Sequence, residues 1–134
     1  MSPRRRIMLV EDSPTQAERL RVLLEADGLE VVHSASAEEA LDRIDATRPE
    51  VIVLDYRLPG MNGDEFCREI RLNVNTRAIP ILMLTVDRSD AAQMRGLESG
   101  ADDYLDKSAD PEILVVRVRN LLRKSEGAAS IVDI

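Results

Sequence analysis

The sequence contains very few aromatic residues, one cysteine and no long hydrophobic run. Phe, Trp and Tyr make up 2% of 134 residues, so the rings against which flavins, nucleobases and sugars usually stack are nearly absent. The lone Cys67 can form neither an internal disulfide nor a cysteine zinc site, which favours the reducing cytoplasm over a secreted scaffold. The apolar run Ile7 to Val10 is too short for a signal peptide or a membrane span. We therefore expect no membrane partner.

An excess of basic charge is also missing. Asp and Glu number 25 against 18 Lys and Arg, which gives a formal net charge of -7. This charge disfavours direct binding of nucleic acid by this domain. With 44% hydrophobic residues, 6 Gly and 6 Pro, the chain has the composition of one ordinary folded domain.

Five short apolar runs alternate with segments that carry helix start signals. The runs are rich in Val, Ile and Leu without polar alternation, as expected of strands covered on both faces; they span residues 7–10, 29–32, 51–54, 79–84 and 104–105. Helices are expected from Ser13-Pro14 to Gly28, from Ser36, from Gly63 or Asp64, from Ser89 to before Gly100, and from Asp110-Pro111 to Lys124. This order predicts an α/β (βα)5 fold with a parallel sheet.

The helical periodicity stops after Lys124. Residues 125–134 read Ser-Glu-Gly-Ala-Ala-Ser followed by a short apolar fragment. We interpret residues 1–124 as one domain and residues 125–134 as a linker or the start of a further C-terminal region.

Polar side chains stand at the ends of the predicted strands. In an open parallel sheet, ligands bind beyond the carboxyl ends of the strands. The first strand is followed by Glu11 and Asp12, the third by Asp55, the fourth by Thr85 and the fifth by Asp106-Lys107. In the doubly wound strand order 2-1-3-4-5, the first and third strands are neighbours, so Asp12 and Asp55 would face each other.

Clustered carboxylates repel one another, and a hard divalent cation relieves that repulsion. Mg²⁺ suits such a site because it binds a few carboxylates, keeps several waters and bridges to phosphate oxygens. A carboxylate can then attack a phosphoryl group and form an aspartyl phosphate. Lys107 would meet the charge that develops on the phosphoryl oxygens.

Residues 4–124 resemble the receiver domain of two-component response regulators, the CheY-like family, which has a flavodoxin-like doubly wound sheet of five parallel strands. Four features carry the resemblance: Ile-Met-Leu-Val-Glu11-Asp12; Val-Ile-Val-Leu-Asp55 followed by Leu58-Pro59-Gly60-Met61-Asn62-Gly63; Leu84-Thr85; and Gly100-Ala101-Asp102-Asp103-Tyr104-Leu105-Asp106-Lys107. The four occur in order and at matching spacing.

The resemblance implies that Asp55 accepts a phosphoryl group from a histidine kinase or a phosphotransfer protein. Mg²⁺ would be bound directly by Asp12 and Asp55, by Glu11 through water, and by the backbone carbonyl of Arg57. Such a domain is not an enzyme in the ordinary sense, since it promotes only its own phosphorylation and dephosphorylation.

The resemblance also implies a switch. Lys107 would pair with a phosphoryl oxygen, Thr85 would close onto the phosphoryl group, and Tyr104 would rotate inward behind Thr85. The change would reach the face formed by the helix over residues 89–99 and the last strand and helix. An output domain, a downstream protein or a second copy of the chain could bind there.

Two positions depart from the family pattern. Lys107 is followed by Ser108 where the family usually has a cis-proline, and a cis bond without proline costs about 3 to 4 kcal/mol. We therefore expect a trans peptide and a rearranged loop. Val86 stands where a small residue usually contacts the phosphoryl group through its amide. Its larger side chain could narrow the access of small phosphodonors or of the hydrolytic water to the site. The phosphorylated form would then last longer.

In receivers of winged-helix transcription factors, three charge pairs connect the two subunits across the dimer face. This chain lacks most of the residues that form those pairs. Only Asp103 and Arg117 match that pattern; the other expected pairs read Gln93 with Ile113 and Ser99 with Arg119. The sequence therefore disfavours that particular dimer, although Ile113 would suit a more apolar contact.

Three other functions fit parts of the pattern. A receiver-shaped module that binds partners without phosphorylation is the main alternative, with Val86 and Ser108 as its only support. A metal-dependent phosphatase with an aspartyl nucleophile commonly needs a second carboxylate two residues later, where this chain has Arg57. A flavodoxin-like electron carrier would need a Ser/Thr-rich phosphate loop and stacking aromatics, which the chain lacks.

Overall fold

The computed structural model describes residues 4–86 and 100–132. Five parallel strands form one sheet in the order β2-β1-β3-β4-β5, which confirms the predicted doubly wound fold. The strands are β1 (Arg6–Val10), β2 (Glu30–Ser34), β3 (Val51–Asp55), β4 (Ile81–Thr85) and β5 (Asp103–Asp106). The helices within the described ranges are α1 (Pro14–Ala26), α2 (Ala37–Thr47), α3 (Gly63–Leu72) and α5 (Pro111–Val132).

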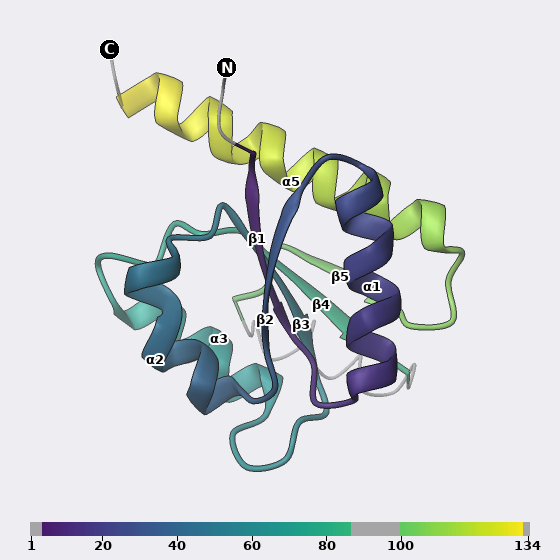
Figure 1. Ribbon diagram of the computed structural model, residues 1–134. Helices are drawn as coiled ribbons and strands as arrows, with labels where there is room; N and C mark the ends of the chain where they lie inside the picture. Colours follow the sequence, from purple (N-terminus) through teal and green to yellow (C-terminus); the bar gives the residue numbers. More distant parts are fainter. Residues whose placement is uncertain (1–3, 87–99, 133–134) are drawn as a thin grey trace.

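The helices cover both faces of the sheet. Helices α2 and α3 lie on one face and α1 and α5 on the other (Figure 1). Each face has its own buried cluster: Met8, Ile52 and Phe66 belong to the first, and Leu9, Val53 and Val118 to the second. Because successive strand side chains point to opposite faces, the uninterrupted apolar runs of the central strands supply both clusters.

Short polar side chains fix the starts of three helices. The Ser13 hydroxyl accepts the Gln16 N–H at 3.3 Å, the Ser36 hydroxyl accepts the Glu39 N–H at 3.1 Å, and the Asn62 side chain accepts the Glu65 N–H at 2.9 Å. Each bond satisfies a backbone N–H that has no partner inside its helix. The third helix thus begins at Gly63, as predicted.

Several boundaries differ from the sequence predictions, among them the start of β4 and the end of α5. Strand β4 begins at Ile81 rather than Ile79, since Pro80 has no N–H to give to the ladder and only its carbonyl pairs, with the Ile52 N–H. Helix α5 runs past Lys124 to Val132. Residues 125–132 contain good helix formers and no proline, and their single glycine costs a helix only about 1 kcal/mol. The helix predicted between Ser89 and Gly100 lies outside the described residues.

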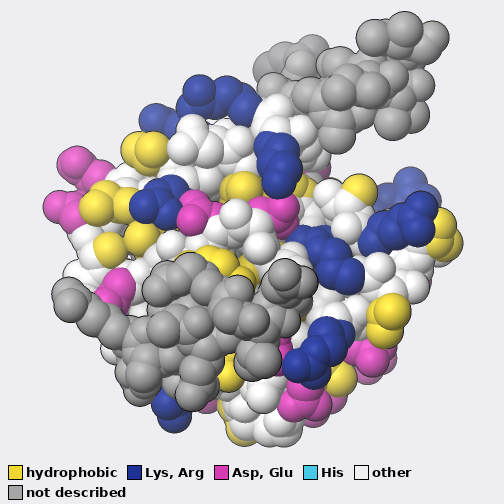
Figure 2. Space-filling view, turned by 180° about the vertical axis from the view of Figure 1, so that it is seen from behind, with side chains coloured by type: hydrophobic (Ala, Val, Ile, Leu, Met, Phe, Trp, Pro, Cys, Tyr) yellow, Lys and Arg dark blue, Asp and Glu magenta, His cyan; other side chains and the backbone are white. Residues whose placement is uncertain are grey.

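The surface carries charges of both signs. In the view from behind, Lys and Arg side chains alternate with Asp and Glu and with small apolar areas (Figure 2). No helix within the described residues is long and apolar enough to cross a membrane.

Candidate functional site

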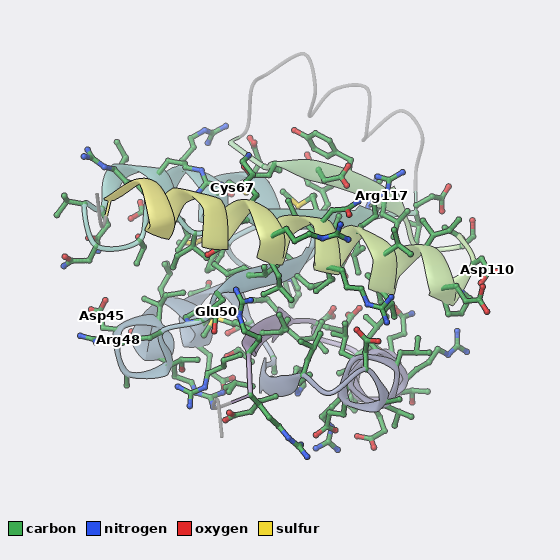
Figure 3. The ribbon with its side chains drawn as sticks, turned by 90° about the horizontal axis from the view of Figure 1, so that it is seen from above. Asp45, Arg48, Glu50, Cys67, Asp110 and Arg117 are labelled. Atoms are coloured by element: carbon green, nitrogen blue, oxygen red, sulfur yellow. The ribbon has the colours of Figure 1, made fainter. Side chains whose placement is uncertain are left out.

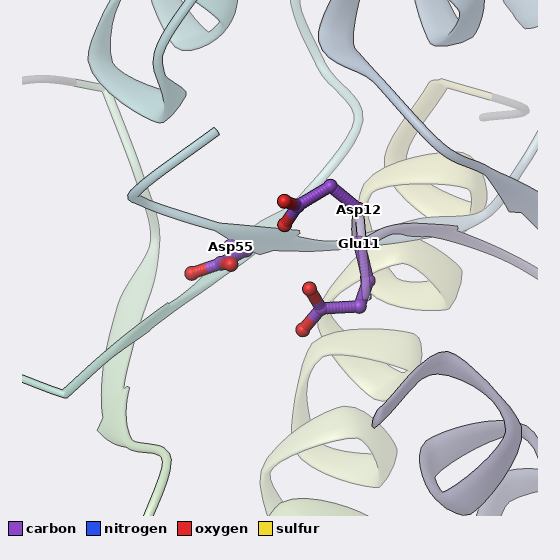
Figure 4. A group of neighbouring side chains, drawn as sticks. All are labelled: Glu11, Asp12 and Asp55. Carbon is purple, nitrogen blue, oxygen red and sulfur yellow. The ribbon is translucent and has the colours of Figure 1, made fainter. Parts of the chain in front are cut away.

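Three carboxylates meet at the carboxyl end of the sheet. Asp55 is the last residue of β3, and Glu11 and Asp12 follow β1, the neighbouring strand. Each contributes one carboxylate oxygen, and these three oxygens lie within 4.8 Å of one another. Figure 4 shows the three side chains together at this edge of the sheet. Glu11 is 1% exposed and Asp55 7%, whereas Asp12 is exposed to solvent. The strand order therefore brings together three acids that the sequence predicted to meet.

Lys107 supplies the positive charge of this cluster. Its Nζ donates to Glu11 Oε1 at 2.7 Å and to Asp55 Oδ2 at 2.9 Å. The side chain of Lys107 is 14% exposed, so both ion pairs are largely shielded from water. A backbone bond from the Lys107 N–H to the Thr85 carbonyl, 2.8 Å long, ties the lysine to the end of β4.

Burial and charge act against each other at this cluster. Burial raises the pKa of Asp55 above its usual value; the Lys107 ammonium opposes that shift, and the Glu11 carboxylate adds to it. Burial alone would lower the pKa of Lys107, but its bonds to Glu11 and Asp55 more than offset this, so the pKa is raised. Lys107 therefore stays charged at neutral pH.

The turn after β5 is built without a cis peptide. The Lys107–Ser108 bond is trans, as predicted. The Ser108 N–H and hydroxyl both donate to Asp106 Oδ1 at 2.8 Å, and the Ala109 N–H donates to the Asp106 carbonyl at 2.9 Å. Asp106 thus folds the chain back through its side chain, where a proline would otherwise have set the turn.

The remaining predicted site residues lie on or just after β3, β4 and β5. Thr85 ends β4 and is buried, and Val86 follows it with 63% of its surface exposed. Tyr104 is half-buried on β5 and packs against the core beneath α2 and α3. The Arg57 N–H donates to Asp55 Oδ1 at 3.3 Å, which places the start of the β3–α3 loop beside the cluster.

A groove opens beside Lys107, between α1 and the start of α5. It has a volume of about 440 Å³ and is lined by apolar side chains with a polar end: Leu20, Leu23, Leu84, Val86, Leu105 and Leu114, with Gln16, Arg19, Asp106, Lys107 and Ser108. Val86 and Lys107 both line this groove, so the position singled out in the sequence shares a wall with the lysine of the cluster.

The charges on α5 pair within the chain. Arg117 Nη1 lies 2.8 Å from Asp103 Oδ1 and 2.9 Å from Asp103 Oδ2, and it projects from α5 toward β5 (Figure 3). Arg119 pairs with Asp27, the residue that follows α1. Gln93 and Ser99 lie outside the described residues.

Sequence reasoning missed two contacts of the cluster. Gln16 Oε1 accepts from Lys107 Nζ at 2.8 Å. His33 Nε2 lies 2.7 Å from the Glu11 carbonyl oxygen. Neither contact joins residues close in sequence, and no local pattern signals them.

The donor set suits a hard divalent cation. Three carboxylates face one ammonium, which leaves a formal excess of two negative charges in a largely buried site. The three candidate ligand atoms are all carboxylate oxygens. Because Asp12 is exposed to solvent, the site can accommodate an ion that keeps several of its water ligands. The residues present therefore fit Mg²⁺ on charge and ligand type.

Comparison with known proteins identifies the family. Residues 7–119 match the model of the response regulator receiver domain. The chain belongs to this family. Among its relatives, the DNA-binding response regulator MtrA of Mycolicibacterium smegmatis is 41% identical over 123 residues, which is 92% of this chain and 53% of MtrA. The chain thus spans about half the length of the curated relatives it matches.

Solved structures agree with the assignment. The receiver domain of a signal transduction histidine kinase from Syntrophus aciditrophicus is 38% identical, with a TM-score of 0.81, and the match covers 89% of this chain and 90% of that one. The chemotaxis protein CheY4 of Vibrio cholerae is 30% identical, with a TM-score of 0.81, covering 89% of this chain and 99% of that one. The same fold therefore occurs in the receiver domain of a histidine kinase and in a chemotaxis protein.

Proposed function

We propose that this receiver domain is a phosphoacceptor switch of a two-component system and that Asp55 is the residue phosphorylated. One observation carries the proposal: a buried carboxylate at the end of β3 lies 2.9 Å from a lysine ammonium and beside two further acids. The donor would be the phosphohistidine of a histidine kinase or of a phosphotransfer protein. Family membership supports this assignment.

Asp12 and Asp55 would hold Mg²⁺ directly, Glu11 through water, and the carbonyl of Arg57 would complete the protein ligands. When bound, the ion would neutralise part of the charge on the phosphoryl oxygens and orient the group for attack. Because burial and Glu11 make ionised Asp55 unfavourable, a cation would also keep that carboxylate ionised and nucleophilic.

The transfer exchanges one phosphorus bond for another. An Asp55 carboxylate oxygen attacks the phosphorus, the bond to the donor nitrogen breaks, and the imidazole leaves with the electron pair. Lys107 pairs with a phosphoryl oxygen as the Asp55 carboxylate becomes an acyl phosphate. Water later attacks the phosphorus, the bond to the Asp55 oxygen breaks, and inorganic phosphate leaves while the carboxylate is restored. The domain would thus promote only its own phosphorylation and dephosphorylation.

The new dianion would change the end of β4. The Thr85 hydroxyl would close onto the phosphoryl group, the Val86 amide would contact it, and Tyr104 would move further into the core behind Thr85. Strand β5 and α5 would carry the change to an output domain, a downstream protein or a second copy of the chain. Helix α5, which continues past Lys124, would form the physical connection to any following region. We place the domain in the cytoplasm, the compartment that a lone thiol favours.

The test is direct. The protein is incubated with Mg²⁺ and acetyl phosphate, and intact mass spectrometry follows an added phosphoryl group that is stable to acid and labile to base. We expect the adduct on the parent protein and on Asp45→Asn, an exposed control on α2, and none on Asp55→Asn.

Other outcomes point to the alternatives. A protein that gains no phosphoryl group and does not bind beryllofluoride is a receiver-shaped binding module. Sustained release of phosphate from a phosphate ester would indicate a phosphatase instead.

A further inference from the structure

The side chain of Gln16 makes a polar contact with Lys107 that the proposed function does not use. Gln16 lies in the first turn of α1, and its Oε1 is 2.8 Å from Lys107 Nζ. The ammonium has three N–H groups, and Glu11, Asp55 and Gln16 accept one each. Two of these acceptors are anionic, and Gln16 is neutral.

The start of α1 explains why this amide is available. In a capping box, a Gln three residues after the N-cap Ser reaches back to the backbone N–H of that Ser. Here the Ser13 N–H donates instead to Glu11 Oε2 at 3.1 Å. The other half of the box is intact, since the Gln16 N–H donates to Ser13 Oγ. Glu11 therefore takes over the acceptor role at the cap, and the Gln16 side chain turns to Lys107.

We propose that Gln16 is a positioning residue for Lys107 in phosphoryl transfer. This inference rests on the proposed function. When Asp55 becomes an acyl phosphate, it loses its charge, and the ammonium must turn one N–H to a phosphoryl oxygen. Gln16 bonds to neither Asp55 nor Glu11, and as a neutral acceptor it does not repel the phosphoryl dianion. It holds one N–H throughout the transfer and so keeps the other two aimed at the reacting group.

Gln16→Leu removes the acceptor and keeps a side chain of similar size at an exposed position. We expect the rate constant for phosphorylation by acetyl phosphate to fall about tenfold, as loss of a hydrogen bond to a charged group implies. The dissociation constant for Mg²⁺ should stay within about twofold, since Gln16 is not among the acids of the cluster. Thr15→Leu, the exposed neighbour on α1, is the matched control and should phosphorylate like the parent.

A double-mutant cycle tests whether Gln16 acts through Lys107. In the parent, Gln16→Leu should raise the unfolding equilibrium constant in urea about fivefold. In a Lys107→Met background, the same substitution should change it by less than about twofold, because the ammonium that Gln16 accepts from is gone. Equal effects in the two backgrounds, or unchanged phosphorylation of Gln16→Leu, would overturn the proposal. If the parent itself gains no phosphoryl group, the proposed function fails; the cycle then still reports whether Gln16 acts on Lys107.

Discussion

Removal of the Lys107 charge tests the electrostatic account of the site most sharply. Lys107→Met keeps most of the unbranched side chain and deletes the ammonium that faces Glu11 and Asp55. Both acids are buried, and their oxygens lie within 4.8 Å of each other. Two unit charges at that distance repel by about 3.5 kcal/mol at an effective dielectric constant of about 20.

Protonation sets an upper limit on this cost. Keeping one carboxyl with an ordinary pKa of about 3.9 protonated at pH 7 costs about 4 kcal/mol, so a larger repulsion would be relieved by proton uptake. We therefore expect Lys107→Met to lower the free energy of unfolding by about 3 kcal/mol at pH 7.5 in EDTA, within the range found when a buried ion pair loses one partner.

The assay is urea unfolding followed by circular dichroism, with and without Mg²⁺. Mg²⁺ should restore much of the lost stability, because a ligand that binds only the folded state stabilises it by mass action. A second substitution, Asp55→Asn, should restore stability without Mg²⁺ by removing one of the two charges. Lys124→Met, which breaks an exposed pair with Asp102, is the control and should cost less than about 1 kcal/mol.

The pH dependence follows from the direction of the Asp55 shift. Its pKa is already raised in the folded parent, and loss of the ammonium that opposes the shift raises it further. The folded state then binds more protons than the unfolded chain, so the stability of Lys107→Met falls as pH rises from the unfolded pKa through the folded one. The loss in free energy of unfolding that Lys107→Met causes should therefore be smaller at pH 5 than at pH 8. A variant as stable as the parent in EDTA, or one whose loss is independent of Mg²⁺, Asp55→Asn and pH, would refute the reasoning.

Two further predictions concern residues around the site. Val86→Ala should shorten the lifetime of the phosphoryl group several-fold and leave the unfolding midpoint unchanged, because Val86 is 63% exposed; equal dephosphorylation half-lives would show that the larger side chain does not shield the acyl phosphate. The Cys67 thiol should not react with Ellman's reagent at pH 8 until the protein unfolds, since burial raises its pKa to about 12. Rapid labelling of the folded protein would contradict this.

Much of the fold could be predicted from the order of short patterns. Runs such as Val51–Leu54 lack polar alternation, and that pattern is itself a consequence of burial on both faces of a parallel sheet. The caps at Ser13 and Ser36 involve residues three positions apart, so a short stretch of sequence is enough to predict them. Some of the predicted boundaries were wrong. Strand β4 begins after Pro80 rather than at Ile79, and helix α5 continues through its single glycine to Val132.

The sequence by itself determined which residues stand at the strand ends, and therefore the acids Glu11, Asp12 and Asp55 and the lysine that meets them. It also determined the trans peptide at Lys107–Ser108, since no proline lowers the cost of the cis form. Only the tertiary structure decided which side chains accept hydrogen bonds from the Lys107 ammonium. Glu11 accepts from the Ser13 N–H, and this leaves the Gln16 amide to accept from Lys107, which lies 91 residues away. Such a contact depends on where folding brings α1 and the end of β5, and no local pattern encodes that distance.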